Sequence, residues 1–134
     1  MRQARHDPIG QRTLLFGGSS PDQRADRGDT WAWTGAGWTQ AAAPTAPRTH
    51  AELGLTGTGV ILAGGMETGA MMQLVDGAWK PAAVAGGPGL RYLPAMAYDP
   101  RRGVTVLFGG GDPATDRLLD DTWELSATGW RKIR

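Results

Sequence analysis

"TVLFGG" occupies residues 105–110 and places four apolar or β-branched residues directly before two glycines. The same pattern occurs earlier as "TLLFGG" at residues 13–18 and as "VILAGG" at residues 60–65. Each run is too short for a helix, is rich in β-branched and aromatic residues, and ends at a turn signal, so each predicts a strand that is buried on both faces. Three such runs in 134 residues indicate an internal repeat.

The first and third copies of the repeat align without a gap. Four motifs of the first copy are Asp7-Pro8, Gly17-Gly18, Asp29-Thr30-Trp31 and Gly37-Trp38. Their counterparts, each 92 positions later, are Asp99-Pro100, Gly109-Gly110, Asp121-Thr122-Trp123 and Gly129-Trp130. The middle copy has Gly64-Gly65 and Trp79, but it is shorter between them and carries Met71-Met72 where its neighbours have Thr-Trp. We interpret it as a degenerate copy of the same unit.

Each copy predicts four antiparallel strands. The stretches "HAELGL" and "LPAMAY" precede a turn and the buried run, "DTWAW" and "DTWEL" alternate polar and apolar residues, and a last strand follows the turns "TGAG", "VDGA" and "SATG". No segment has the length, caps and spacing of a helix. The fold class is therefore all-β, in a single domain with units at about residues 1–42, 48–82 and 91–134.

The order of motifs from Arg91 to Trp130, "RYLPAMAYDP" followed by "VLFGG", "DTW" and "GW", resembles a bacterial kelch repeat. The resemblance covers almost the whole chain and implies blades of a β-propeller, a family that includes the galactose oxidase propeller domain, sugar-acid mutarotases and protein-interaction scaffolds. It implies that the glycine pairs allow a turn and a close approach of the next blade. It also implies tryptophans that fill the wedges between blades, which here would be Trp31, Trp38, Trp79, Trp123 and Trp130.

The number of blades is a difficulty. Propellers close with about four to eight blades, and kelch rings resemble six- or seven-bladed ones, whereas this chain has three repeats. An open arc would expose one apolar face at each end. Either two copies pair into a six-bladed ring with two-fold symmetry, or the chain is a piece of a longer protein that supplies further blades. The first copy lacks the arginine-containing lead of the others, which favours the second explanation.

Composition excludes several classes of function. Lys and Arg number 14 against 13 Asp and Glu, so the chain lacks the basic surface of a nucleic-acid-binding protein. There is no cysteine for disulfides or thiolate metal sites. No apolar run has membrane-spanning length and the start does not resemble a signal peptide, so we expect no membrane partner and a cytoplasmic location if the chain is complete. Otherwise the compartment stays open.

Candidate ligand-binding residues follow from the resemblance. In kelch propellers, the connections between the second and third strands, and those leading into each inner strand, gather around one mouth of the central channel. This implies seven candidates there: Asp22, Arg24, Arg48, Glu67, Arg91, Asp112 and Arg117. Arg48 and Arg91 stand at equivalent places in successive copies. They suit either a ring of guanidinium groups that faces an acidic ligand, or a structural role in which they bond carbonyls and tie blades together.

Metal and cofactor sites are weakly supported. The loops after the first and third glycine pairs each contain three spaced aspartates, which could offer oxygens to calcium, but arginines among them oppose a cation. We interpret these aspartates as turn formers, and Asp29 and Asp121 as acceptors of backbone hydrogen bonds. With His6 and His50 as the only histidines, a copper site like that of galactose oxidase cannot be assembled. We expect neither a metal nor a cofactor.

The sequence thus favours a binding module that recognises a protein or carbohydrate through the channel-mouth loops. The rival is an enzyme similar to the sugar-acid mutarotases, which would need an acid or base at the mouth such as His50 or Glu67. A third reading assigns the chain no independent activity, as blades of a larger propeller. We assign no catalytic residue.

Overall fold

The computed structural model describes residues 2–22, 25–68, 70–84 and 86–134, and these residues form strands and turns without any helix. Sheet 1 contains β1 (Gln3–Asp7), β2 (Arg12–Phe16), β3 (Thr30–Trp33) and β4 (Trp38–Ala42). Sheet 2 contains β5 (Ala51–Thr56), β6 (Gly59–Gly64), β7 (Met72–Val75) and β8 (Ala78–Pro81). Sheet 3 contains β9 (Ala95–Asp99), β10 (Val104–Phe108), β13 (Thr122–Ser126) and β14 (Gly129–Lys132). A hairpin of β11 (Gly111–Asp112) and β12 (Arg117–Leu118) lies between β10 and β13.

Every strand pair is antiparallel and joins neighbours within one repeat, so the predicted all-β class and its four-stranded units are confirmed. The described residues contain no helix that is long and apolar enough to cross a membrane.

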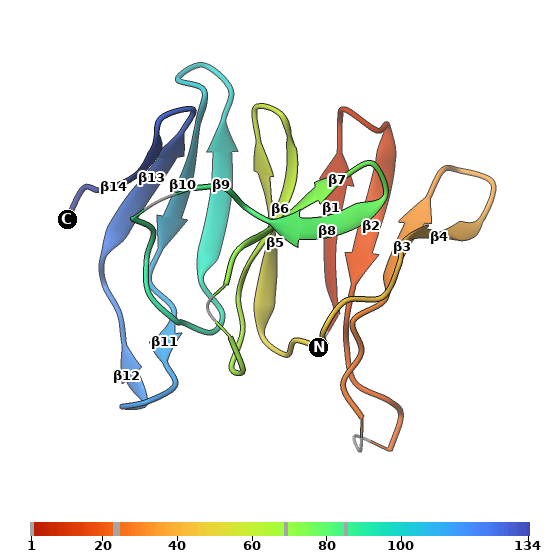
Figure 1. Ribbon diagram of the computed structural model, residues 1–134, viewed down its shortest axis with the longest axis horizontal. Helices are drawn as coiled ribbons and strands as arrows, with labels where there is room; N and C mark the ends of the chain where they lie inside the picture. Colours follow the sequence, from red (N-terminus) through yellow and green to blue (C-terminus); the bar gives the residue numbers. More distant parts are fainter. Residues whose placement is uncertain (1, 23–24, 69, 85) are drawn as a thin grey trace.

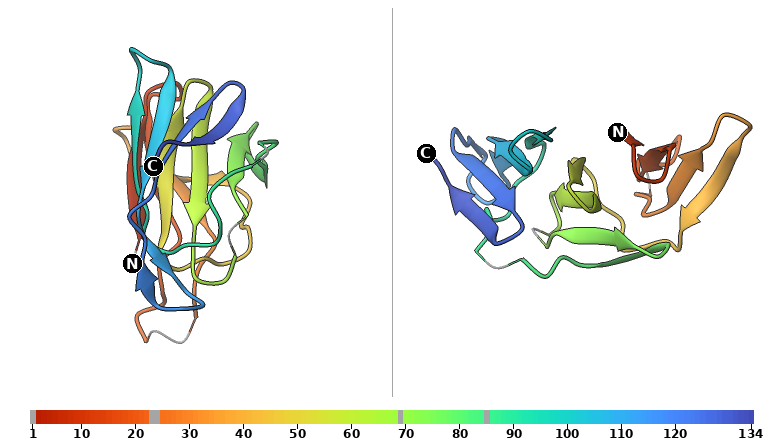
Figure 2. Two further views of the ribbon diagram at one scale, coloured as in Figure 1. Left: turned by 90° about the vertical axis from the view of Figure 1, so that its left-hand side faces the viewer. Right: turned by 90° about the horizontal axis from the view of Figure 1, so that it is seen from above.

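The three sheets stand side by side (Figure 1). Seen from above, they form an open arc with sheet 1 and sheet 3 at its two ends (Figure 2). The first strands lie next to one another, because β5 contacts β1 on one side and β9 on the other. Sheet 2 is therefore the central sheet, with a neighbour on each face.

The junction between sheets 1 and 2 is an apolar cluster that includes Leu14, Phe16, Leu53, Val60 and Leu62. Trp79 of β8 packs its ring edge-on to Phe16, with ring centroids 5.8 Å apart. Its indole Nε1 donates a hydrogen bond of 2.7 Å to the hydroxyl of Thr30. The tryptophan therefore fills the wedge between the two sheets, as expected, and its polar atom is satisfied across the junction.

The junction between sheets 2 and 3 is a second cluster, which contains Ile61, Ala63, Met96, Leu107 and Leu125. Trp123 and Trp130 pack against it. Successive residues of β6 alternate between the two clusters, so this strand is buried on both faces.

One expectation, about the burial of the strands before the glycine pairs, was wrong for the two end sheets. All three runs before the glycine pairs were predicted to be buried on both faces, but only β6 is, because β2 and β10 have a neighbouring sheet on one side only. Phe108 at the end of β10 is 51% exposed. Trp38 was expected in a wedge but is 48% exposed. It packs on Trp33, with ring centroids 5.6 Å apart.

The glycine pairs behave as predicted. Gly64 has φ 73°, and a Cβ atom there would lie 2.7 Å from the carbonyl oxygen of Arg91. The amide of Gly65 donates to that same oxygen at 2.9 Å. In the first pair, Gly17 has φ 65° and faces the carbonyl of Arg48. Each of these pairs thus turns the backbone and meets the segment that leads into the next sheet.

Candidate functional site

Arg91 lies inside sheet 3 with only 4% of its surface exposed. Its guanidinium donates to the carbonyl of Gly109 at 2.9 Å and to both carboxylate oxygens of Asp121, at 2.7 and 3.1 Å. The indole Nε1 of Trp123 donates to Asp121 at 2.7 Å. The hydrogen bond from Arg91 is the main cause that lowers the pKa of Asp121 to about 2, against the effect of partial burial. Arg91 therefore joins the entry of β9 to the ends of β10 and β13.

Arg48 takes the equivalent place in sheet 2 and is 5% exposed. Its Nη1 donates to the carbonyls of Gly64, at 3.4 Å, and Ala70. Its buried Nε has no hydrogen-bond partner within the described ranges. Burial lowers the pKa of Arg48, and the nearby charge of Glu67 partly opposes this.

Both arginines are buried, and their guanidinium groups bond within their own repeat. The structural role had these groups tie adjacent blades together, whereas the bonds seen here join segments of one repeat.

Asp29 of sheet 1 stands where Asp121 stands in sheet 3. Its Oδ2 accepts a hydrogen bond of 2.6 Å from the indole Nε1 of Trp31. Its Oδ1 is buried and has no hydrogen-bond partner among the residues that the structure describes. The hydrogen bonds seen at the carboxylates of Asp29 and Asp121 thus come from an indole and a guanidinium, in place of the backbone amides we expected.

The remaining candidates are dispersed over three loops at one end of the sheets (Figure 1). Asp22 accepts from the hydroxyl of Ser20, and Glu67 accepts from the amide and hydroxyl of Thr49. The exposed Arg117 stands opposite Asp112 in the antiparallel register of the β11–β12 hairpin. Arg24 lies outside the described residues.

The acidic loops form local turns. Asp112 accepts hydrogen bonds from the amide of Ala114, at 2.8 Å, and the hydroxyl of Thr115. Asp116 accepts one from the hydroxyl of Tyr92 at 3.0 Å. Over the described ranges, no three acidic or histidine side chains are placed to hold a metal ion. The aspartates therefore act as turn formers in the third copy.

Arg5 was not a candidate from the sequence, yet it reaches across the centre of the arc. It donates to the carbonyl of Leu53 at 3.1 Å and to that of Met96 at 3.0 Å, and it pairs with Glu52 at 3.2 Å. Burial raises the pKa of Glu52, and the charge of Arg5 partly opposes this. One guanidinium thus links sheets 1, 2 and 3.

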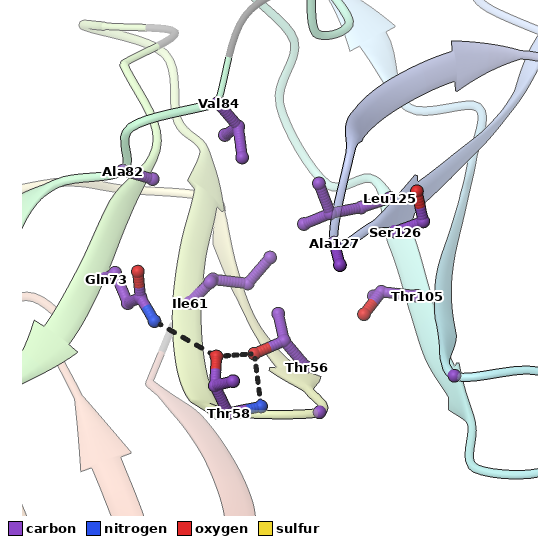
Figure 3. A pocket seen from close by; sticks show the side chains of 12 residues that line it. Thr56, Thr58, Ile61, Gln73, Ala82, Val84, Thr105, Leu125, Ser126 and Ala127 are labelled. Atoms are coloured by element: carbon purple, nitrogen blue, oxygen red, sulfur yellow. Dashed lines mark hydrogen bonds between the residues drawn. The ribbon is translucent and has the colours of Figure 1, made fainter.

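A cavity of about 320 Å³ opens between sheets 2 and 3 (Figure 3). Ile61 and Gln73 line one wall, and Thr105 and Leu125 line the other. Gln73 donates to the hydroxyl of Thr58 at 3.4 Å. Among the residues that the structure describes, those that line the cavity carry no ionisable side chain.

A scan of the sequence against protein-family models gives no match, and no curated protein is similar to the chain. The resemblance to kelch repeats therefore stays a prediction from the sequence motifs.

Proposed function

We propose that the chain is a segment of a kelch-type β-propeller and a binding module whose first partner is a second copy of itself. The observation that carries the proposal is the exposure of two aromatic side chains at opposite ends of the arc, Phe108 at 51% and Trp38 at 48%. Contiguous exposed apolar surface marks an interaction site, and Trp38 adjoins the exposed Trp33.

The junction between sheets 1 and 2 gives a pattern for this contact. Phe108 and Thr122 stand 92 positions after Phe16 and Thr30, the two residues that receive Trp79. Trp38 and Trp79 occupy equivalent positions in their hairpins, because each pairs with the residue five positions before it, Trp33 and Leu74. Sheet 3 of one copy would therefore receive Trp38 of another copy as sheet 1 receives Trp79.

Two copies joined in this way at both ends would form a closed six-bladed ring with two-fold symmetry. Further blades on a longer polypeptide would cover the same two faces. Both arrangements bury Phe108 and Trp38, and because each is already about half buried, the further burial is worth roughly 1 kcal/mol for each side chain.

A charged network limits the contact area on sheet 3. Glu124 pairs with Arg102 and Arg131 on the outer face, where sheet 1 has the buried Ala32 at the equivalent position. The apolar part of the interface is therefore the half of the sheet near Phe108.

The test is the absolute mass of the chain by light scattering across a dilution series. We expect twice the monomer mass of 14.2 kDa for the unmodified chain, and a return to the monomer for Phe108→Glu. Leu118→Glu is the matched control, because Leu118 is 86% exposed in the hairpin and outside the proposed interface. A folded monomer for the unmodified chain, or an unchanged dimer for Phe108→Glu, would overturn self-pairing.

In such a ring the loops after the glycine pairs would surround one rim, and a protein or carbohydrate ligand would bind there. Among the described candidates, Asp22, Glu67 and Arg117 are exposed and Asp112 is half-buried. The mutarotase-like alternative needs a mouth arginine to hold a carboxylate, and Arg48 and Arg91 are already engaged within their own repeats.

A further inference from the structure

We propose that sheet 1 contains a guanidinium-binding site, formed by Asp29, Trp31 and Gly17, which takes an arginine side chain. The inference goes beyond the proposed self-pairing and does not depend on it. It comes from a comparison of the first and third copies of the repeat within this one chain.

Sheet 3 shows the occupied form of the site. Its guanidinium, from Arg91, contacts both oxygens of Asp121 and the carbonyl of Gly109. The indole Nε1 of Trp123 donates a hydrogen bond to the same carboxylate. A bidentate pair of this kind is stronger and more directional than a single charged hydrogen bond.

Sheet 1 shows the same frame without the guanidinium. Trp31 donates to Asp29 at 2.6 Å, as Trp123 donates to Asp121 at 2.7 Å. The amide of Gly17 donates to the carbonyl of Asp29 at 3.0 Å, which is the distance of the corresponding bond in sheet 3. The backbone and the indole are thus already in place in both copies.

The two sites differ at one carboxylate oxygen. Oδ1 of Asp121 receives the Nη1 of Arg91 at 2.7 Å, whereas Oδ1 of Asp29 is buried without a hydrogen-bond partner among the described residues. A buried carboxylate oxygen without a donor is destabilising, so a donor that fits the site will be bound favourably.

A cavity lies beside Asp29, and because Oδ1 itself is covered, an entering guanidinium must displace the atoms over it. Asp29 lines a cavity of about 320 Å³ together with Leu15, Trp31, Trp38 and two arginines, Arg2 and Arg27. Neither of these arginines is hydrogen-bonded to the Oδ1 atom.

The segments before the first strands of sheets 1 and 3 indicate how an arginine would reach the site. Gly110 in sheet 3 lies against the backbone of Pro94, three residues after Arg91, and Gly18 in sheet 1 lies against the side chain of Arg2. Arg2 and Pro94 each stand directly before the first strand of their sheet. An arginine four residues before Gln3 would therefore match Arg91, which stands four residues before Ala95. The guanidinium could equally come from a separate polypeptide.

The first arm of the test supplies the arginine in the same chain. Met1 and Arg2 are replaced by a new initiator methionine followed by a copy of residues 87–94, "GPGLRYLP". The grafted arginine then stands four residues before the first strand, as Arg91 does in sheet 3. The matched control is the same graft with lysine in place of its arginine, because lysine carries the charge but cannot form the bidentate pair. We expect the arginine graft to unfold at least about 4 °C higher than the lysine graft, and we expect Asp29→Asn to remove that difference.

The second arm supplies the arginine from outside. The unmodified protein is titrated with the acetylated and amidated peptide GPGLRYLP or with its lysine version, and the indole N–H resonance of Trp31, assigned with Trp31→Phe, is followed by NMR. A saturable shift with the arginine peptide alone supports binding of a separate polypeptide, and a gain in the first arm alone supports an arginine in the same chain. Equal melting of the two grafts together with equal titrations of the two peptides would overturn the site, as would a gain that survives Asp29→Asn.

Discussion

At the scale of the residue, Asp121 shows how one carboxylate holds three parts of a sheet together. It binds the guanidinium of Arg91 and the indole of Trp123, and its carbonyl accepts from the amide of Gly109. Since Arg91 is buried, its charge needs this partner, and the loss of either member leaves an uncompensated charge inside the sheet.

The pKa of Asp121 gives a pH prediction. Its value falls from the ordinary 3.8 to about 2 in the folded chain. The pair therefore contributes its full stability above about pH 4 and loses it as the pH falls toward about pH 2. Asp121→Asn should be less stable at neutral pH and should lose less stability across this window, measured as the urea midpoint at each pH. Asp76→Asn, an exposed turn residue, is the control. Parallel curves for Asp121→Asn and the unmodified chain would contradict the assignment.

At the scale of the element, the two tryptophans at equivalent positions should differ in their effect. Trp79 packs on Phe16 and donates to Thr30 across a junction, whereas Trp38 is half exposed. Trp79→Ala should cost about 3–5 kcal/mol of unfolding free energy, and Trp38→Ala less than about 1 kcal/mol. Urea unfolding in the Phe108→Glu background measures both values without the contribution of self-pairing. Equal losses would mean that the wedge between sheets 1 and 2 is not packed as described.

The strands could be predicted from the sequence because their signals are local. Alternation, β-branched runs and glycine pairs fix where a strand begins and ends, even in the degenerate middle copy. Whether a strand is buried on both faces depends on its neighbours in space and not on its local sequence. The runs at β2, β6 and β10 are alike in sequence, but only β6 lies between two sheets. Trp38 was misplaced for the same reason, because its motif predicts a wedge and its sheet lies at the end of the arc.

The candidate site was less predictable, because its contacts depend on register. The partners of Arg91 lie 18 and 30 residues away, on β10 and at the start of β13, and no spacing rule within "RYLP" identifies them. The β11–β12 hairpin was missed because "GDPATDRLLDD" is dominated by turn residues. Arg5 was missed because the atoms it bonds are mainly backbone carbonyls of other sheets, which a sequence motif does not reveal.

At the scale of the whole molecule, the arc has one centre and two ends. Sheet 2 shares an apolar cluster with each neighbour, and Arg5 bonds the first strands of all three sheets near the centre. The end sheets each share only one cluster. Opening of an end sheet therefore disrupts one cluster, whereas opening of β6 disrupts both.

This difference predicts the order of amide hydrogen exchange. In the Phe108→Glu monomer, the amides of β6 should exchange most slowly and those of β2 and β10 faster, because exchange from β6 requires the loss of both clusters. Exchange followed by NMR at neutral pH resolves the three strands. In the unmodified chain, a closed ring would give β2 and β10 a second neighbour and bring their exchange close to that of β6. The control is Leu118→Glu, which should match the unmodified chain, since Leu118 contributes to neither cluster. If β10 exchanged more slowly than β6 in the monomer, sheet 2 would not be the stable centre of the fold, and the packing of the arc would have to be described differently.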